Sequence, residues 1–183
     1  MKHLVFALIA VTTLVVHADD GPWEALAQPG AVVLFRHATA PGVSDPPGFR
    51  LDDCATQRNL DEQGRGEAAR IGEEFRRRGI AVGAVWSSQW CRARDTARLA
   101  FGAQARHEPA FDALRQGPPE RDAQLARARE VLAGWRGPGV LVVVTHQVNI
   151  AALTGRGALS AEGVVVRPAA MLPWTVLARI PPP

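Results

Sequence analysis

Apolar runs and amphipathic segments alternate along most of the chain. A continuous apolar run at residues 31–35 predicts a strand that is buried on both faces. Further strands are predicted at 81–86 and at 140–144, of which the second has the strongest pattern. The segments that follow them predict helices, over about 61–78, 91–101, 119–135 and 148–153. Weaker patterns predict a short strand at 104–108 and two edge strands near 163–167 and 174–180.

The alternation of strands and helices indicates an α/β fold. We expect three layers, with a mainly parallel sheet that carries helices on both faces. The clearest helical stripe consists of Ala68, Ile71 and Phe75, and Gly79 ends that helix. Residues 38–59 contain Pro, Gly, Asp and Ser without periodicity, so they predict a long loop, and long loops in compact domains are usually functional.

The first 18 residues predict a secretory signal peptide that is not part of the fold. A basic start that contains Lys2 precedes the apolar stretch Leu4–Val16, and a small-x-small pattern ends at Ala18. Because the stretch is too short to span a bilayer, we expect cleavage after Ala18, with an uncleaved anchor or a buried helix as the alternative. Residues 19–183 then form a single domain, periplasmic or secreted, with no membrane span after cleavage.

Composition narrows the class of protein further. A length of 183 residues with 47% hydrophobic and 21% charged residues suits one globular domain with a real core. The 21 basic side chains exceed the 18 acidic ones only slightly, and they are spread along the chain rather than gathered in a stripe. This pattern argues against nucleic-acid binding. Nearly every cation is an arginine, which suits phosphate-like anions.

Export changes how the two cysteines are interpreted. Cys54 and Cys91 form an even pair in an oxidising compartment, so we expect one disulfide between them. Two cysteines cannot form a zinc site alone, and a catalytic thiol is disfavoured because neither cysteine has a histidine nearby in sequence. We expect no metal and no cofactor.

Reactive side chains follow three predicted strands. Arg36 and His37 come after the first strand, Arg92 lies just beyond the second, and His146 follows the strand at 140–144. In an open α/β sheet, ligands bind at the carboxyl ends of the strands, so these four residues should meet in one crevice. His107 lies in a weaker context, and we interpret it as structural.

This set of residues is suited to phosphoryl transfer. An imidazole whose second nitrogen is held by a backbone carbonyl can attack phosphorus at neutral pH. Arg36 and Arg92 can each clamp two oxygens of the transferring group, and His146 can donate a hydrogen bond to it. Water would then cleave the phosphohistidine, without a metal ion.

The motifs together resemble the histidine phosphatase (phosphoglycerate-mutase-like) superfamily. They are Arg36-His37-Ala38, Ser88-x-x-x-Arg92-Ala93-x-x-Thr96-Ala97, Thr145-His146, and the helix entry Asn59-Leu60-Asp61-x-x-Gly64-x-x-x-Ala68. The resemblance spans about residues 31–180 and implies that fold. It also implies that His37 is the phosphorylated nucleophile and that Arg36, Arg92 and His146 complete the phosphate pocket. A compact exported chain without a large cap resembles the small bacterial branch that includes periplasmic lipopolysaccharide-core heptose phosphatases.

The chain departs from this family at the proton donor. Where many members carry a glutamate in a Leu-x-Glu step, this sequence has Leu114-Arg115-Gln116, and the aspartate of the acid phosphatase branch is replaced by Gln147. Glu120 and Asp112 are the nearest candidates for the general acid. Gln57 and Arg58, at the end of the long first loop, are expected to bind the substrate.

These features predict a metal-independent phosphatase that acts on a small phosphorylated substrate. A non-catalytic phosphate-binding protein that kept the pocket without its acid is the alternative from another class. A phosphomutase is disfavoured, because export separates the chain from cytosolic sugar phosphates.

Overall fold

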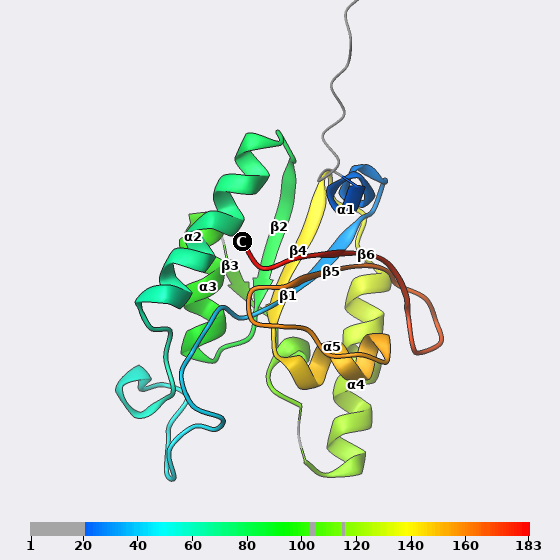
Figure 1. The fold of residues 1–183 in the computed structure, drawn as a ribbon. Helices are drawn as coiled ribbons and strands as arrows, with labels where there is room; N and C mark the ends of the chain where they lie inside the picture. The colour runs from blue at the N-terminus through cyan, green and yellow to red at the C-terminus, as the bar shows by residue number, and fades with distance from the viewer. Residues whose placement is uncertain (1–20, 103–104, 115) are drawn as a thin grey trace, which may run out of the picture.

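A computed structural model describes residues 21–102, 105–114 and 116–183, which form a six-stranded sheet flanked by helices (Figure 1). The strands are β1 (Val32–Arg36), β2 (Val82–Ser87), β3 (Ala105–His107), β4 (Val140–Thr145), β5 (Gly163–Arg167) and β6 (Thr175–Ile180). Their order across the sheet is β3-β2-β4-β1-β5-β6. The pairs β2–β3, β2–β4 and β1–β4 are parallel, whereas β1–β5 and β5–β6 are antiparallel. The prediction of a mainly parallel sheet is confirmed.

Within the described residues, five α-helices connect or precede the strands. They are α1 (Gly21–Glu24), α2 (Glu62–Arg77), α3 (Cys91–Phe101), α4 (Pro118–Ala133) and α5 (Gln147–Thr154). Short 3₁₀ turns occur at η1 (Ala25–Ala27), η2 (Cys54–Thr56) and η4 (Pro109–Phe111). The predicted helices and strands agree with the observed ones to within two residues at each end.

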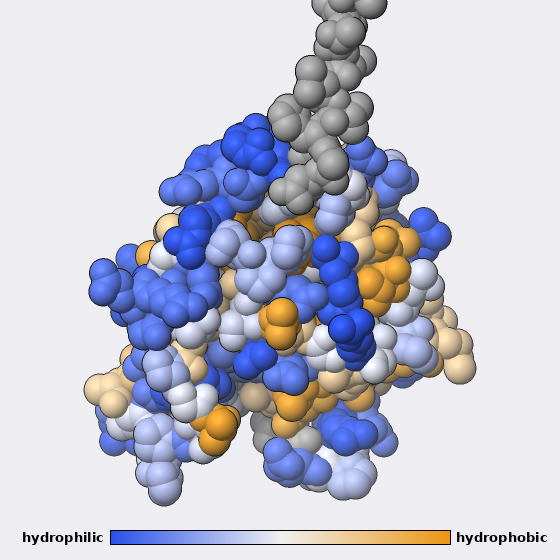
Figure 2. All heavy atoms as spheres, viewed as in Figure 1, coloured by the Kyte–Doolittle hydropathy of each residue, from blue (hydrophilic) through white to orange (hydrophobic). Residues whose placement is uncertain are grey.

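Alternate residues of the central strands supply two separate cores. On β1, Val33 and Phe35 face one core, whereas Val32 and Leu34 face the other. Helices α2 and α3 cover the first face, and α4 and α5 cover the second (Figure 1). Because both faces are covered, β4 is buried along its whole length, as an internal parallel strand requires. The surface seen in Figure 2 is largely hydrophilic, with apolar side chains only in small groups.

One strand prediction is wrong in its position. The strand at 163–167 is not an edge strand, because β5 pairs with β1 on one side and with β6 on the other. Its run Val164–Val166 is fully buried, which is the pattern of an internal strand. Only β6 and β3 lie at the edges.

The predicted signal peptide, residues 1–18, lies outside the described residues. Among the residues that the structure does describe, no helix is both long enough and apolar enough to cross a membrane.

Candidate active site

The carboxyl ends of three adjacent strands bring the predicted residues together. His37 follows β1, His146 follows β4 and Ser88 follows β2. The ladder continues past the strands, because the His37 amide donates to the Thr145 carbonyl and the Ser88 amide to the Val144 carbonyl, both at 3.0 Å. The two imidazole rings consequently lie with their centroids 5.6 Å apart.

His37 is held as a neutral imidazole with one nitrogen free of a proton. Its Nδ1 lies 2.8 Å from the Ala38 carbonyl oxygen, so Nδ1 carries the hydrogen and Nε2 keeps its lone pair. The Nε of Arg92 donates to this Nε2 at 3.3 Å. Burial lowers the pKa of His37 to about 3, and the charges of Arg92, Arg36 and Arg58 act in the same direction, against the opposing hydrogen bond to Ala38.

The start of α2 supports the turn that follows His37. The Asp61 carboxylate caps the helix by accepting from the Gly64 amide at 2.8 Å. A Cβ on Gly64 would lie 2.0 Å from the Thr39 carbonyl oxygen, so only glycine permits this approach. The buried Glu67 then accepts hydrogen bonds from the Thr39 amide and hydroxyl, at 2.9 and 3.0 Å. These contacts explain the helix-entry motif as a support for the turn beside the imidazole.

Helix α3 connects the arginine at its start to the same turn. The hydroxyl of Thr96 donates to the Arg92 carbonyl at 2.7 Å and accepts from the Ala38 amide at 3.0 Å. One buried side chain therefore ties the helix that carries Arg92 to the residue after the imidazole.

Three guanidinium groups converge on the imidazoles with more donors than acceptors. Arg36 donates from Nη1 to the Ala158 carbonyl at 3.0 Å, and Arg58 donates from Nη1 to the Ala40 carbonyl. The Nε atoms of both arginines are buried without a hydrogen-bond partner among the described residues. Burial lowers the pKa of Arg36 and of Arg92, and the charge of Arg58 contributes to both shifts. Buried, unmatched N–H donors of one charge sign are chemically suited to an anion.

Asp45, which the sequence patterns do not single out, lies against Arg92 and the backbone of Arg58. Its carboxylate accepts from the Arg92 Nη1 at 2.9 Å, the Arg58 amide at 2.9 Å and the Trp90 indole at 3.1 Å. Burial by itself would raise the pKa of Asp45, but the Arg58 amide and the Arg92 charge outweigh burial and hold the pKa below its usual value. Asp45 belongs to an aperiodic loop, so no local signal distinguishes it from the other loop aspartates.

His146 is buried beside His37 and bonded to the loop after β2. Its Nε2 lies 2.8 Å from the Ser88 hydroxyl, which also accepts from the Trp90 amide at 3.2 Å. That arrangement lets Ser88 donate to Nε2, so the imidazole hydrogen is assigned to Nδ1. Burial is the main cause of the lowered pKa of His146, and His37 and Arg92 also contribute.

The two residues expected to read the substrate occupy different environments. Arg58 approaches the imidazoles and the other guanidinium groups closely enough to affect their pKa values. Gln57 is buried, and its side-chain amide is hydrogen-bonded to backbone groups. Its Nε2 donates to the carbonyls of Arg50 and Leu51, and its Oε1 accepts from the Cys91 amide at 3.0 Å. These contacts favour a role for Gln57 in holding the loop.

The two candidates for the general acid lie on the segment after β3. The Asp112 carboxylate accepts from the Gln89 amide at 2.8 Å and lies 3.1 Å from the His107 Nε2. Glu120 is exposed in the first turn of α4. Asp112 thus borders the loop that carries Ser88, whereas no described contact links Glu120 to the imidazoles.

The predicted disulfide is present. Cys54 and Cys91 are bonded across a sequence separation of 37 residues. Cys91 directly precedes Arg92, and Cys54 lies in the first loop, so the bond joins the loop to the start of α3. The Arg94 guanidinium lies against the pair, 2.8 Å from the Cys54 Sγ.

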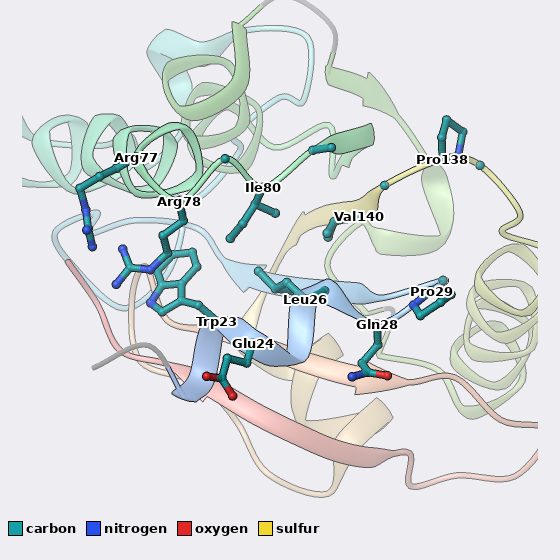
Figure 3. Close-up of a pocket in the computed structure, with 16 residues that line it drawn as sticks. Trp23, Glu24, Leu26, Gln28, Pro29, Arg77, Arg78, Ile80, Pro138 and Val140 are labelled. Carbon is teal, nitrogen blue, oxygen red and sulfur yellow. The ribbon is translucent and has the colours of Figure 1, made fainter. Parts of the chain in front are cut away.

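A large cavity lies at the opposite, amino end of the strands and is separate from this site (Figure 3). Its volume is about 860 Å³, and Leu26, Ile80 and Val140 contribute apolar lining. Arg78 stacks on Trp23 there, with 4.5 Å between the guanidinium carbon and the ring centroid. The lining residues include no histidine or cysteine. Within the described residues, no three His, Cys, Asp or Glu side chains gather as a metal site would require.

The chain is similar to known proteins in part of its sequence and in its fold. Residues 32–118 match the family model described as the histidine phosphatase superfamily (branch 1). Curated protein sequences give no match. Among solved structures, the chain is similar to a protein described as the phosphohistidine phosphatase SixA of Agrobacterium tumefaciens. The identity is 22%, with 85% of this chain and 100% of that chain covered and a TM-score of 0.55.

Two further solved structures share the fold. The protein histidine phosphatase SixA in complex with tungstate is 15% identical, with 81% and 95% of the two chains covered and a TM-score of 0.57. A mycobacterial glucosyl-3-phosphoglycerate phosphatase is 18% identical, with 81% and 97% covered and a TM-score of 0.55. At these identities the similarity establishes the fold.

Proposed function

We propose that this chain, whose residues 32–118 match the model of the histidine phosphatase superfamily, hydrolyses phosphomonoesters through a phosphohistidine on His37. The observation that carries the proposal is the state of His37. A neutral imidazole presents the Nε2 lone pair towards Arg92, and Arg36 and Arg58 each have a buried Nε that has no partner among the described residues. The similar solved structures named above are described as phosphatases, which supports the same class of reaction.

The first chemical step transfers the phosphoryl group to His37. The Nε2 lone pair forms an N–P bond while the ester P–O bond breaks, and the leaving oxygen takes up a proton. In the free protein, the Arg92 Nε occupies the position in front of Nε2. Substrate binding would turn this N–H towards a phosphate oxygen and leave the lone pair to the phosphorus atom.

The second step returns the imidazole to its starting state. A water oxygen attacks phosphorus, the N–P bond breaks, and its electron pair returns to Nε2. One proton of the water passes to the group that protonated the leaving oxygen, and inorganic phosphate is released. The hydrogen bond from Nδ1 to the Ala38 carbonyl holds the ring in one tautomer through both steps. His146 would donate from Nδ1 to the transferring group, because its Nε2 is engaged by Ser88.

The charge balance of the site matches a phosphomonoester. The site contains three guanidinium groups, those of Arg36, Arg58 and Arg92, and the carboxylate of Asp45, which pairs with Arg92. With both histidines neutral, these groups together carry a formal charge of +2. That charge balances a phosphate dianion, and the arginines supply the stabilisation for which other phosphatases use a metal ion.

Asp112 and Glu120 are the candidates for the acid that protonates the leaving group. Asp112 is the better placed, because it bonds to the loop that carries Ser88. A substrate whose leaving group is already a weak base would react without either residue.

We further propose that the protein acts outside the cytoplasm. The Cys54–Cys91 bond is typical of an oxidising compartment, and the first 18 residues predict a signal peptide.

Turnover of p-nitrophenyl phosphate in the presence of EDTA tests this function. We expect hydrolysis by the wild type and its loss in His37→Asn, while that variant still binds inorganic phosphate in calorimetry because its arginines are intact. A rapid alkaline quench followed by mass measurement should detect the phosphoenzyme. Phosphate binding without turnover in the wild type would instead identify a phosphate-binding protein.

A further inference from the structure

The carboxylate of Asp45 is unexpected in a site built to attract an anion. Its side chain is only 9% exposed, and that of its partner Arg92 is 7% exposed. Both carboxylate oxygens are satisfied: Oδ1 accepts from the Arg58 amide and Arg92, and Oδ2 accepts from the Trp90 indole and Arg92. Asp45 is therefore a fixed part of the site rather than a mobile loop residue.

Its contact determines which edge of the Arg92 guanidinium faces the nucleophile. Nη1 bonds to Asp45 at 2.9 Å, and Nε faces the His37 Nε2 at 3.3 Å. Nη2 makes no hydrogen bond to any residue that the structure describes. The edge formed by Nε and Nη2 is thus the one presented beside His37, and this edge can bind two oxygens of a phosphate at once.

We propose that Asp45 is a positioning residue, which anchors the Nη1 of Arg92 so that its Nε and Nη2 grip the phosphate in line with His37. The inference rests on the phosphatase function proposed above. Without the anchor, the long side chain of Arg92 gains other rotamers, and the two-point grip on the phosphate is lost. A carboxylate beside a phosphate also repels it, so the proposal requires that orientation outweighs repulsion.

The test measures whether Asp45 acts through Arg92. We expect Asp45→Asn to lower kcat/KM for p-nitrophenyl phosphate by about 10-fold to 100-fold, since a misplaced catalytic donor costs less than a deleted one. In an Arg92→Ala background the same substitution should change kcat/KM by less than about 2-fold, because the group that Asp45 orients is gone. Binding of inorganic phosphate, measured by calorimetry, should follow the same pattern.

A matched control comes from the same loop. Asp52→Asn makes the same chemical change at a side chain that is 87% exposed, and it should leave kcat/KM unchanged. If Asp45→Asn does not fold, Asp45→Ala removes the amide donor that would face Trp90 and allows the same comparison.

Three results would overturn the proposal. They are unchanged kcat/KM in Asp45→Asn, tighter phosphate binding in that variant, and an equal loss in the wild-type and Arg92→Ala backgrounds. The last would mark Asp45 as a general support of the loop. A wild type that neither binds nor hydrolyses phosphate would refute the phosphatase function itself, which is a different outcome.

Discussion

Lowering the pH from about 7.5 to about 5 should destabilise the wild-type protein more than it destabilises a His37→Asn variant. The pKa of His37 is about 3 in the folded protein, against an ordinary value of 6.5 that applies to the unfolded chain. Between these values the unfolded state binds a proton that the folded state does not, so stability falls as the pH falls through 6.5.

The size of the effect follows from that difference in pKa. Each pH unit inside the window changes the free energy of unfolding by about 1.4 kcal/mol. At about pH 5, the wild type should therefore have lost about 2 kcal/mol of this free energy through His37 alone. For a chain of this size, that corresponds to a decrease in Tm of about 4–8 °C. The variant lacks the titrating group and should not show this part of the decrease.

Urea unfolding at the two pH values measures the free energies directly. At the higher pH, the two proteins differ in the free energy of unfolding because the variant has lost the packing of the imidazole. This difference cancels when each protein's value at the lower pH is compared with its own value at the higher pH. His146 is present in both proteins. The prediction is refuted if both lose the same free energy to within about 0.5 kcal/mol. His37 would then be open to protons in the folded state, and the argument for a neutral nucleophile would be lost.

Three substitutions test other parts of the site. Arg36→Lys removes a planar two-point donor and should reduce kcat for p-nitrophenyl phosphate by about 10²–10³, with an unchanged circular dichroism spectrum. The double variant Cys54→Ser/Cys91→Ser opens a loop closed across 37 residues and should lose about 4 kcal/mol in denaturant unfolding, whereas reductant should not affect the variant's own stability. Gly64→Ala would place a Cβ 2.0 Å from the Thr39 carbonyl oxygen, so we expect a loss of about 1–3 kcal/mol together with reduced activity; wild-type values for both would show that the turn beside the nucleophile tolerates displacement.

Local patterns account for most of the elements and for the main site residues. A buried parallel strand such as β4 requires a continuous apolar run, and a surface helix such as α2 requires a stripe with helical spacing. Both patterns depend only on residues that are close together in the chain, so the sequence shows them directly. The placement of His37 and His146 at strand ends follows from the same patterns, and the structure brings the two rings together.

Other features depend on contacts between segments that are far apart in the chain. A buried apolar run does not reveal its partners, which is why β5 was expected at an edge although it pairs with two strands. Asp45 has no periodic neighbours, and its role exists only because Arg92, 47 residues away, is folded against it. The contacts of Gln57 with the loop backbone and the Cys91 amide likewise join segments that are distant in sequence.

The sequence by itself thus determined the order of elements, the side chains capable of phosphoryl chemistry and the pairing of two cysteines. Tertiary structure alone decided the strand order, the carboxylate that contacts Arg92 and the hydrogen-bond partners of both imidazoles. The physical reason is the distance along the chain over which each property is set. Backbone periodicity is set within a few residues, whereas burial, hydrogen-bond partners and pKa values are set by whichever distant segments pack together.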